Sequence, residues 1–344
     1  MTQRPVLAST MGDPAGIGPE ICVRALLSPD VRDVSRGFVI GDARVLSRAL
    51  EVCGLSATLN RITAPEDMAD RPGVIDVLHQ DSADPAVLRM GEVQPLGGEA
   101  AYAAIRASID LAMVHRIEGV VTAPINKESL QAAKIPFIGH TEMFAEHTGA
   151  REEMTMFTIS GLKIFFLTRH VSLRKACELI TEPRVSKGID NCVKALRQLG
   201  YDQPHLAVAA LNPHGGEDGM FGREEIEAIK PAIASARARG MRISGPVPAD
   251  SVFHLARIGR YDAVLSLYHD QGHIAAKMMD FEKTVSVTLG LPILRTSVDH
   301  GTAFDIAGTG KASAVSMIEA IRVAADYVVR GVRLGDEPEA KAAE

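Results

Sequence analysis

The feature that most constrains the fold is a regular alternation of short apolar segments with longer amphipathic ones. Segments such as 6–10 (VLAST), 119–124 (GVVTAP) and 205–211 (HLAVAAL) have the length and composition of buried strands. Between them, stretches such as 97–116 place apolar residues at helical spacing. A chain that alternates strands and helices in this way is typical of an α/β protein with helices on both faces of its sheet.

Three regions depart from this alternation. Segments 153–159 and 162–170 flank Ser160-Gly161, a good hairpin turn, and predict an antiparallel insertion. Residues 60–97 are rich in Pro, Asp and Gly and are expected to form an irregular surface excursion. The last residues, 336–344 (DEPEAKAAE), are expected to be frayed or disordered.

Size and charge narrow the class of protein. The chain has 344 residues, which is too long for one ordinary core and suits two domains. A net charge of -6 argues against a nucleic-acid binder, which would carry a basic patch. Aromatic residues make up only 4% of the chain and there is no Trp, so base-stacking platforms are not expected.

The cysteines and the first residues indicate a cytoplasmic protein. No pair of cysteines has CxxC spacing, so we expect reduced and mostly buried thiols rather than disulfides. They are Cys22, Cys53, Cys177 and Cys192. A Gly-Asp-Pro turn interrupts residues 1–16 early, so no signal peptide is expected. No apolar run reaches the ~18 residues that a transmembrane helix needs.

Polar, glycine-rich loops follow several of the expected strands. They are 11–20, 122–127, 139–142, 168–174, 212–219, 248–254, 268–273 and 295–310. Because α/β enzymes keep their sites beyond the carboxyl ends of strands, these loops are the expected location of function.

Three histidines hold equivalent positions in these loops. His170 ends one expected strand, and His214 and His269 lie just past two others. They could converge on one divalent cation and leave an open position for substrate or water. Three unrelated loop histidines fit the pattern equally well, because the spacings of 44 and 55 residues are not a local zinc signature.

The remaining polar residues each have a plain structural interpretation as well as a functional one. The segment GIGPE (16–20) could cradle phosphate at a helix start or form a tight turn. His140 and Thr141 could begin a helix or donate to an anionic substrate. Asp250 is favoured as a helix N-cap, and the cations Lys277 and Arg295 are more often solvated surface charges.

Taken together, the loops form an ordered set of motifs. They are MGDPAGIGPE, TAPINK, GHTE, NPHGGEDGMFGREE, GPVPAD, HDQGH and TLGLPILRTSVDHGTAFDIAGTG. In this order they closely resemble the 4-hydroxythreonine-4-phosphate dehydrogenase family. The resemblance spans nearly the whole chain, from residue 5 to about 330.

The resemblance implies a fold and an assembly. The family has two α/β/α domains with a cleft between them, like isocitrate and isopropylmalate dehydrogenases. Residues 1–125 with 275–344 would form the first domain, on the cofactor and substrate side of the cleft. Residues 126–274 would form the second, with the metal histidines and the dimer contacts. The family works as a homodimer whose active site is shared across the interface.

The resemblance also implies a reaction. The family uses NAD(P) and a divalent metal (zinc, magnesium or cobalt) to oxidise the C3 hydroxyl of a 4-phosphorylated hydroxy acid, and the β-keto acid then loses CO2. No obvious Arg cluster lies near the first glycine loop, which favours NAD over NADP. Metal-bound hydroxide, Asp250 or Lys277 could take the hydroxyl proton.

Family roles carry over to particular residues. The metal ligands would be His170, His214 and His269, and the catalytic residues would be Asp250 and Lys277. The substrate contacts would be His140, Thr141, Lys277, Ser286 and Arg295. The cofactor contacts would be Gly301, Thr302 and Asp305. Glu217 and Asp218, in the same loop as His214, are candidates to support the metal ligands through hydrogen bonds.

Some residues depart from the family pattern and bear on the substrate. Ser286 stands where the family has a substrate-binding Asn, and HDQGH (269–273) replaces the HDQGLP of pyridoxine-pathway members. HDQGH and AFDIAG (303–308), which stands where those members have an ALELAG-like run, resemble the subgroup that oxidises 4-phospho-D-threonate or 4-phospho-D-erythronate. The alternatives are 4-phosphohydroxy-L-threonine in pyridoxal phosphate biosynthesis and an aromatic cis-dihydrodiol carboxylate. A non-enzymatic alternative is a scaffold protein that keeps the fold but has lost catalysis. Retention of the three histidines and Lys277 argues against it.

Overall fold

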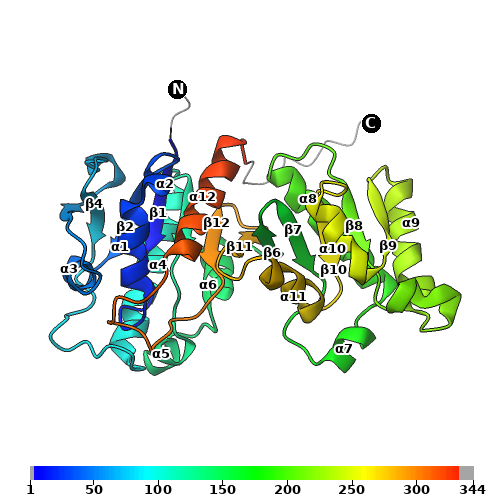
Figure 1. The fold of residues 1–344 in the computed structure, drawn as a ribbon, viewed down its shortest axis with the longest axis horizontal. Coiled ribbons are helices and arrows are strands. Elements are labelled where there is room, and N and C mark those ends of the chain that lie inside the picture. The colour runs from blue at the N-terminus through cyan, green and yellow to red at the C-terminus, as the bar shows by residue number, and fades with distance from the viewer. Residues whose placement is uncertain (1–3, 333–344) are drawn as a thin grey trace. The chain divides into compact units, whose positions relative to one another are not determined.

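The computed structural model describes residues 4–332, which fall into two compact units. Unit 1 comprises residues 4–153 and 290–332, and unit 2 comprises Met154–Leu289. Figure 1 shows the chain entering unit 2 once and returning to unit 1 for its last strand and helix. The expectation for 336–344 lies outside the described residues.

Unit 1 is built on a parallel sheet. Its strands, in the order β3-β4-β2-β1-β5-β12, are Thr58–Ile62, Val74–His79, Arg36–Gly41, Val6–Thr10, Gly119–Thr122 and Arg295–Val298. Every neighbouring pair in that order is parallel. Consequently the loops that follow these strands meet at one edge of the sheet.

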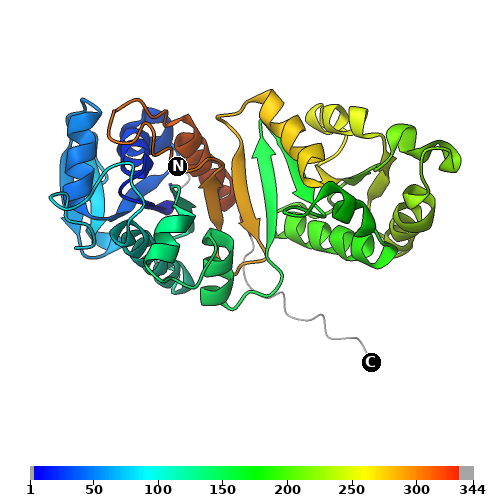
Figure 2. The ribbon, with the colours of Figure 1, turned by 90° about the horizontal axis from the view of Figure 1, so that it is seen from below.

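Helices cover both faces of this sheet (Figure 2). One group packs together on one face: α1 (Gly18–Leu27), α2 (Pro29–Arg32), α3 (Ala43–Val52) and α12 (Val315–Val329). The other face carries α4 (Pro95–Met113), α5 (Lys127–Ala132) and α6 (His140–Thr148). The core between α4 and the sheet is aliphatic and aromatic, with Phe38, Ile105 and Phe144 fully buried.

Unit 2 has a mixed sheet. Its strands, in the order β11-β6-β7-β10-β8-β9, are Val285–Leu289, Met154–Ile159, Leu162–Phe166, Ala263–Ser266, Leu206–Ala209 and Ile243–Val247. The β6–β7 hairpin around Ser160-Gly161 is antiparallel, which confirms the predicted insertion. β11 also pairs antiparallel with β6, whereas the pairs from β7 to β9 are parallel.

The helices of unit 2 flank its parallel strands. They are α7 (Leu173–Glu178), α8 (Glu182–Gln198), α9 (Lys230–Ala238), α10 (Ala249–Arg257) and α11 (His269–Met279). A π-helical turn, Glu225–Ile229, leads directly into α9. Pro231 lies at the start of α9 and lacks the N–H that a continuous α-helix would need there.

The unit boundaries differ from the domain limits given above. Residues 126–153 belong to unit 1, because α5 and α6 pack on α4 and bury Leu130 and Phe144 in its core. Residues 275–289 belong to unit 2, because α11 packs on β7 and β11 pairs with β6.

The prediction of an irregular excursion at 60–97 was wrong for its first part. Residues 58–62 and 74–79 are the two outer parallel strands of unit 1. The pattern was hidden because β4 carries a buried carboxylate, Asp76, among apolar residues. Asn60 Nδ2 and the backbone N–H groups of Ala69 and Asp70 donate to that carboxylate and satisfy it.

Two further expectations concern thiols and membranes. All four cysteines are free, with Cys22 and Cys192 buried and the other two partly exposed. In residues 4–332, no helix is both long enough and apolar enough to cross a bilayer.

Candidate functional site

Four neighbouring parallel strands of unit 2 each lead into a residue predicted to act. His170 follows β7, His269 begins α11 after β10, His214 follows β8, and Asp250 lies in the first turn of α10 after β9. Because the four strands run parallel in the order β7-β10-β8-β9, their carboxyl ends lie side by side. The topology therefore gathers residues that are far apart in the sequence along one sheet edge.

Two of the three histidines approach each other directly. The ring centroids of His170 and His269 lie 6.1 Å apart. His214 is exposed on its loop, with its ring 6.5 Å from that of Phe221. Among residues 4–332, no three His, Cys, Asp or Glu side chains gather closely enough to hold a metal ion. The structure thus brings together His170 and His269 but leaves His214 apart from them.

The HDQGH motif explains how α11 is held in place. Gln271 Oε1 accepts from the backbone N–H of Leu267 at 2.7 Å, and its Nε2 donates to the carbonyl of Ala210 at 2.8 Å. Gly272 allows α11 to lie close to the sheet, since a Cβ there would be 2.6 Å from Phe166 Cε1. Both residues are buried and fix the start of α11, which carries His269.

Asp270 and His273 of the same motif both interact with His269. His269 Nδ1 lies 2.6 Å from Asp270 Oδ1, and a carboxylate can only accept, so Nδ1 carries the proton and Nε2 holds the lone pair. His273 Nδ1 lies 2.9 Å from the carbonyl oxygen of His269. Burial lowers the pKa of His273 to about 4, so its ring is neutral at neutral pH.

The loop that carries His214 has an unusual backbone held by a buried carboxylate. Residues 214–218 all have positive φ, including the non-glycine residues His214, Glu217 and Asp218. Glu225 Oε1 accepts from the backbone N–H groups of Leu211 and Asn212, both at 2.8 Å. The start of the loop is therefore tied to Glu225, which is 1% exposed.

The proposed support from Glu217 and Asp218 is not what the structure shows. The Asp218 side chain is fully exposed, and its ion-pair partner is Lys230. The carboxylates that hold the loop are Glu224 and Glu225, which both accept from Asn212 Nδ2. Sequence reasoning chose the two carboxylates inside the loop, whereas the pair just after it faces inward.

Asp250 does not cap a helix. Pro248 is the N-cap of α10 and no side chain caps its N-terminus, so the N-cap interpretation was wrong. Asp250 instead lines a cavity of about 640 Å³ between α10 and α11, together with Asp270 and Gln271. Asp250 therefore borders a space that a ligand could enter.

The other two predicted residues of unit 2 are also partly exposed. Lys277 lies two turns beyond His269 on α11, with Nζ 5.1 Å from the centre of the Phe281 ring. Ser286 lies on β11 opposite Phe157 of β6. Both side chains are therefore partly accessible to solvent.

The predicted anion-binding residues of unit 1 form one group. His140 and Thr141 begin α6, whose N-terminus has no side-chain cap. Arg295 on β12 is buried, donates to Thr122 Oγ1 at 2.8 Å and lies over the Phe144 ring at 5.2 Å. A helix N-terminus beside a guanidinium is a favourable place for phosphate or carboxylate.

Burial controls the charge of this group. Burial, with the nearby Arg295, holds the pKa of His140 well below its ordinary value, and its Nε2 is a buried atom with no hydrogen-bond partner. Burial also lowers the pKa of Arg295 to about 9, while Glu142 acts in the opposite direction. At neutral pH the site therefore combines a neutral imidazole with a charged guanidinium.

The predicted cofactor residues lie in a segment that packs on the first glycine loop. The carbonyl of Thr302 accepts from the N–H of Ile17 at 3.0 Å, while Gly301 and Asp305 are exposed. A Cβ on Gly16 would lie 2.9 Å from Thr302, and one on Gly18 would lie 2.2 Å from the carbonyl of Met11. These glycines serve close backbone packing, which favours the tight-turn interpretation of GIGPE.

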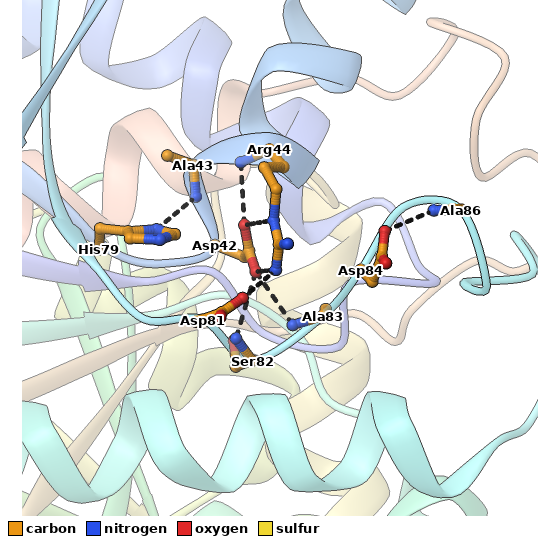
Figure 3. Close-up of polar contacts among 9 residues, drawn as sticks. All are labelled: Asp42, Ala43, Arg44, His79, Asp81, Ser82, Ala83, Asp84 and Ala86. Atoms are coloured by element: carbon orange, nitrogen blue, oxygen red, sulfur yellow. Dashed lines mark hydrogen bonds and ion pairs between the residues drawn. The ribbon is translucent and has the colours of Figure 1, made fainter.

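A buried carboxylate also follows β2, where dinucleotide-binding sheets place the residue that holds ribose. Asp42 accepts from the backbone N–H groups of Arg44, Ser82 and Ala83, and it pairs with the Arg44 guanidinium, which also contacts Asp81 (Figure 3). Its oxygens are therefore engaged in joining the ends of β2 and β4.

Comparison with known proteins decides the family. Residues 33–324 match the family described as pyridoxal phosphate biosynthetic protein PdxA. The chain belongs to the PdxA family. That range contains the strand-end histidines, the α6 anion group and the segment 301–310.

Individual PdxA relatives are closely similar. A protein of Symbiobacterium thermophilum, provisionally named D-threonate 4-phosphate dehydrogenase, is 56% identical over 95% of this chain and 98% of the relative. The crystal structure of 4-hydroxythreonine-4-phosphate dehydrogenase from Klebsiella pneumoniae has a TM-score of 0.88 and 41% identity, covering 94% and 98% of the two chains. A terephthalate 1,2-cis-dihydrodiol dehydrogenase from Burkholderia xenovorans is more distant, with a TM-score of 0.64 and 28% identity over 94% and 98%.

These matches confirm the predicted family and its α/β fold. Sequence reasoning quoted HDQGH without roles for Asp270, Gln271 and His273, and it missed Glu225. The signal for Gln271 and Glu225 was burial of a polar side chain, which a single sequence does not reveal.

The donor set of this PdxA chain fits a divalent cation. Neutral imidazoles are ligands for zinc and cobalt, and three of them leave an open coordination position. Asp270 fixes His269 as the tautomer with a lone pair on Nε2, as carboxylates hydrogen-bonded to metal-binding histidines do. His214 lies in the loop that follows β8, the strand next to β10.

Proposed function

We propose that the protein is an NAD- and divalent-metal-dependent dehydrogenase that oxidises the C3 hydroxyl of a 4-phosphorylated hydroxy acid and then releases CO2. The observation that carries the proposal is the line of His170, His269, His214 and Asp250 along one edge of the unit 2 sheet. Membership of the PdxA family and the dehydrogenase names of the relatives support the reaction class.

The binding roles follow from charge and burial. His140, Thr141 and Arg295 would hold the phosphate or the carboxylate at the α6 N-terminus. Lys277 and Ser286 would contact the same substrate as point charge and hydroxyl donor. Gly301, Thr302 and Asp305 would contact the NAD cofactor, with NADP as the alternative.

In the reaction, a hydride leaves C3 for the nicotinamide and the hydroxyl proton passes to a base. The C–C bond to the carboxylate then breaks, and its electron pair stays on the carbon next to the new ketone. A divalent cation held by His170, His214 and His269 would lower the pKa of the hydroxyl and stabilise charge on its oxygen. Asp250, which borders the α10–α11 cavity, and Lys277 are the candidate proton acceptors.

The substrate is proposed to lack an amine. The Symbiobacterium thermophilum relative, at 56% identity, is named for D-threonate 4-phosphate, and the resemblance of HDQGH and AFDIAG (303–308) to that subgroup points the same way. The protein would act in the cytoplasm as a homodimer with a shared active site. A second candidate, oxidation of an aromatic cis-dihydrodiol carboxylate, draws support from the Burkholderia xenovorans dehydrogenase.

The test compares substrates side by side. NADH formation is measured with 4-phospho-D-threonate, 4-phospho-D-erythronate and 4-phosphohydroxy-L-threonine, each with Zn²⁺, Mg²⁺ or Co²⁺, in wild type and His214→Ala. Preference for the amine-free acids, lost in the variant, supports the proposal. Preference for the amino acid would indicate pyridoxal phosphate biosynthesis instead. Turnover of none of them, with turnover of a dihydrodiol carboxylate, would overturn the phosphate requirement.

A further inference from the structure

One face of α11 carries a stack of imidazoles. His269, His273 and Lys277 lie four residues apart and therefore on the same face of the helix. The rings of His269 and His273 are nearly parallel, with an interplanar angle of 12° and centroids 3.5 Å apart. His273 thus covers one whole face of the His269 ring.

His273 is itself held on its other sides. The ring centroids of Phe157 on β6 and Phe166 on β7 both lie 4.4 Å from that of His273. Its Nδ1 donates to the carbonyl of His269 at 2.9 Å, because that carbonyl can only accept. Two phenyl rings and one hydrogen bond therefore fix the position and the tautomer of His273.

We propose that His273 is a positioning residue that holds the His269 imidazole with its Nε2 directed away from α11 for a divalent cation. This inference rests on the proposed function only for the presence of the cation. Asp270 fixes which nitrogen of His269 carries the proton, and His273 fixes the plane of the ring. Neither group needs to touch the substrate.

Ordinary core packing makes a different prediction. A half-buried aromatic side chain would stabilise α11 against the β6–β7 hairpin, and its loss would lower stability without a specific effect on His269. A positioning role requires that loss of the ring disorder His269 and weaken cation binding. Supporting groups of metal-bound histidines typically contribute about 10–100-fold in metal affinity.

The experiment uses the metal-free full chain labelled with ¹⁵N-histidine, and it has two readouts. NMR follows the ring protons of His269, which the stacked His273 ring shifts upfield. These signals are assigned by their absence in His269→Gln. Titration with Co²⁺, followed by its visible absorption, gives affinity and a signature of coordination geometry. Neither readout depends on turnover.

Three variants separate the contributions. His273→Ala removes the ring and the hydrogen bond, and we expect Co²⁺ affinity to fall about tenfold with loss of the upfield shift. His273→Phe keeps a stacked ring and should retain affinity within about threefold of wild type. His273→Asn keeps a donor without a ring, should behave like the Ala variant, and serves in its place if that protein does not fold.

A matched control comes from the same unit. His205 lies before β8, at the opposite end of the strands, with its ring 5.0 Å from Tyr261 and Nε2 2.8 Å from Ser244 Oγ. His205→Ala should lower thermal stability but leave Co²⁺ affinity unchanged. An equal loss of affinity in this variant would overturn the proposal, as would wild-type affinity and an unchanged His269 spectrum in His273→Ala.

Failure of the proposed function is recognised separately. If wild type binds no Co²⁺, the metal-dependent reaction is wrong, and the NMR readout alone decides the positioning role. An upfield shift that disappears in His273→Ala and persists in His273→Phe supports that role. Signals of His269 that are identical in all variants overturn it.

Discussion

Gln271 Nε2 donates to the carbonyl of Ala210 at 2.8 Å and so joins the strand ends that lead to His269 and His214. The same side chain accepts from the N–H of Leu267. One buried amide thus sets the separation of two candidate metal ligands that lie 55 residues apart in the sequence.

Replacement of Gln271 by Ala should therefore weaken both the fold and the site. It leaves the buried N–H of Leu267 and the carbonyl of Ala210 without this partner, and an unsatisfied buried group costs about 1–3 kcal/mol. Urea unfolding should show a loss in that range, and Co²⁺ affinity should fall. Unchanged affinity in a folded variant would show that the two loops are positioned independently.

Glu225 should make the His214 loop sensitive to acid. Burial alone would raise the pKa of Glu225, but hydrogen bonds from Asn212 and Leu211 outweigh it and hold the pKa below its ordinary value. Its contribution to stability is therefore present above the unfolded-state pKa and is lost as pH falls through the lower folded-state pKa. Denaturant titrations between pH 7 and pH 3 should show this loss in wild type.

Glu225→Gln provides the comparison. The amide of Gln would place a donor opposite Asn212 Nδ2, so the variant should be less stable at pH 7 and should lack the Glu225 part of the acid dependence. An acid dependence identical to that of wild type would mean that other carboxylates are responsible.

The imidazole of His140 should remain neutral from pH 8 to pH 6. Burial and the Arg295 charge lower its pKa, so the unfolded chain binds a proton at a pH where the folded chain does not. Stability should accordingly decline as pH drops below the unfolded-state value of about 6.5. The imidazole proton shifts of His140, assigned with His140→Gln, should stay constant from pH 8 to pH 6; a midpoint inside that range would contradict the burial argument.

Arg295→Lys should impair recognition of phosphorylated substrate. Lys keeps the charge but loses the planar group that donates to Thr122 and lies over Phe144. Loss of one charged hydrogen bond is worth about 1.5–3 kcal/mol, so KM should rise about 10–100-fold with a smaller change in kcat. Thr122→Val keeps the guanidinium and should raise KM less; the reverse order would place Arg295 outside the substrate site.

Asp42→Asn should destabilise unit 1 rather than alter the chemistry. Burial raises the pKa of Asp42, but Arg44 and the N–H groups of Ala83 and Arg44 lower it further, to about 2. That pKa corresponds to about 2 kcal/mol, which is present above pH 4 and lost as pH falls through about 2. Thermal unfolding at pH 7 should show the deficit, while kcat stays near wild type; a large fall in kcat would give Asp42 a role in catalysis.

Much of the fold could be predicted from periodicity because most strands are buried on both faces and read as continuous apolar runs. The outer strand β4 was missed because Asp76 interrupts its pattern, and only the folded chain brings Asn60 and the backbone of Ala69 and Asp70 to that carboxylate. The boundary at 126 was misplaced because a helix can pack on either domain, and sequence does not reveal that Phe144 lies beneath Arg295.

The candidate site was predicted in part. Strand-end position suggested His170, His214 and His269, and the parallel order of β7, β10 and β8 supplies the physical reason. The supporting residues could not be found in this way. Glu225 and Gln271 act through backbone groups of other segments, which depend on the folded chain rather than on a local motif.

The candidate site lies at the carboxyl ends of the parallel strands, and the turns that precede these strands lie at their opposite ends. The turn 258–260 between α10 and β10 is exposed, and at Gly259 an added side chain would meet nothing within 4 Å. Residues can be inserted there without displacing the loops at the other end of the strands. A fluorescent label or a surface-attachment tag placed in this turn would report on or immobilise the enzyme while leaving its chemistry untouched.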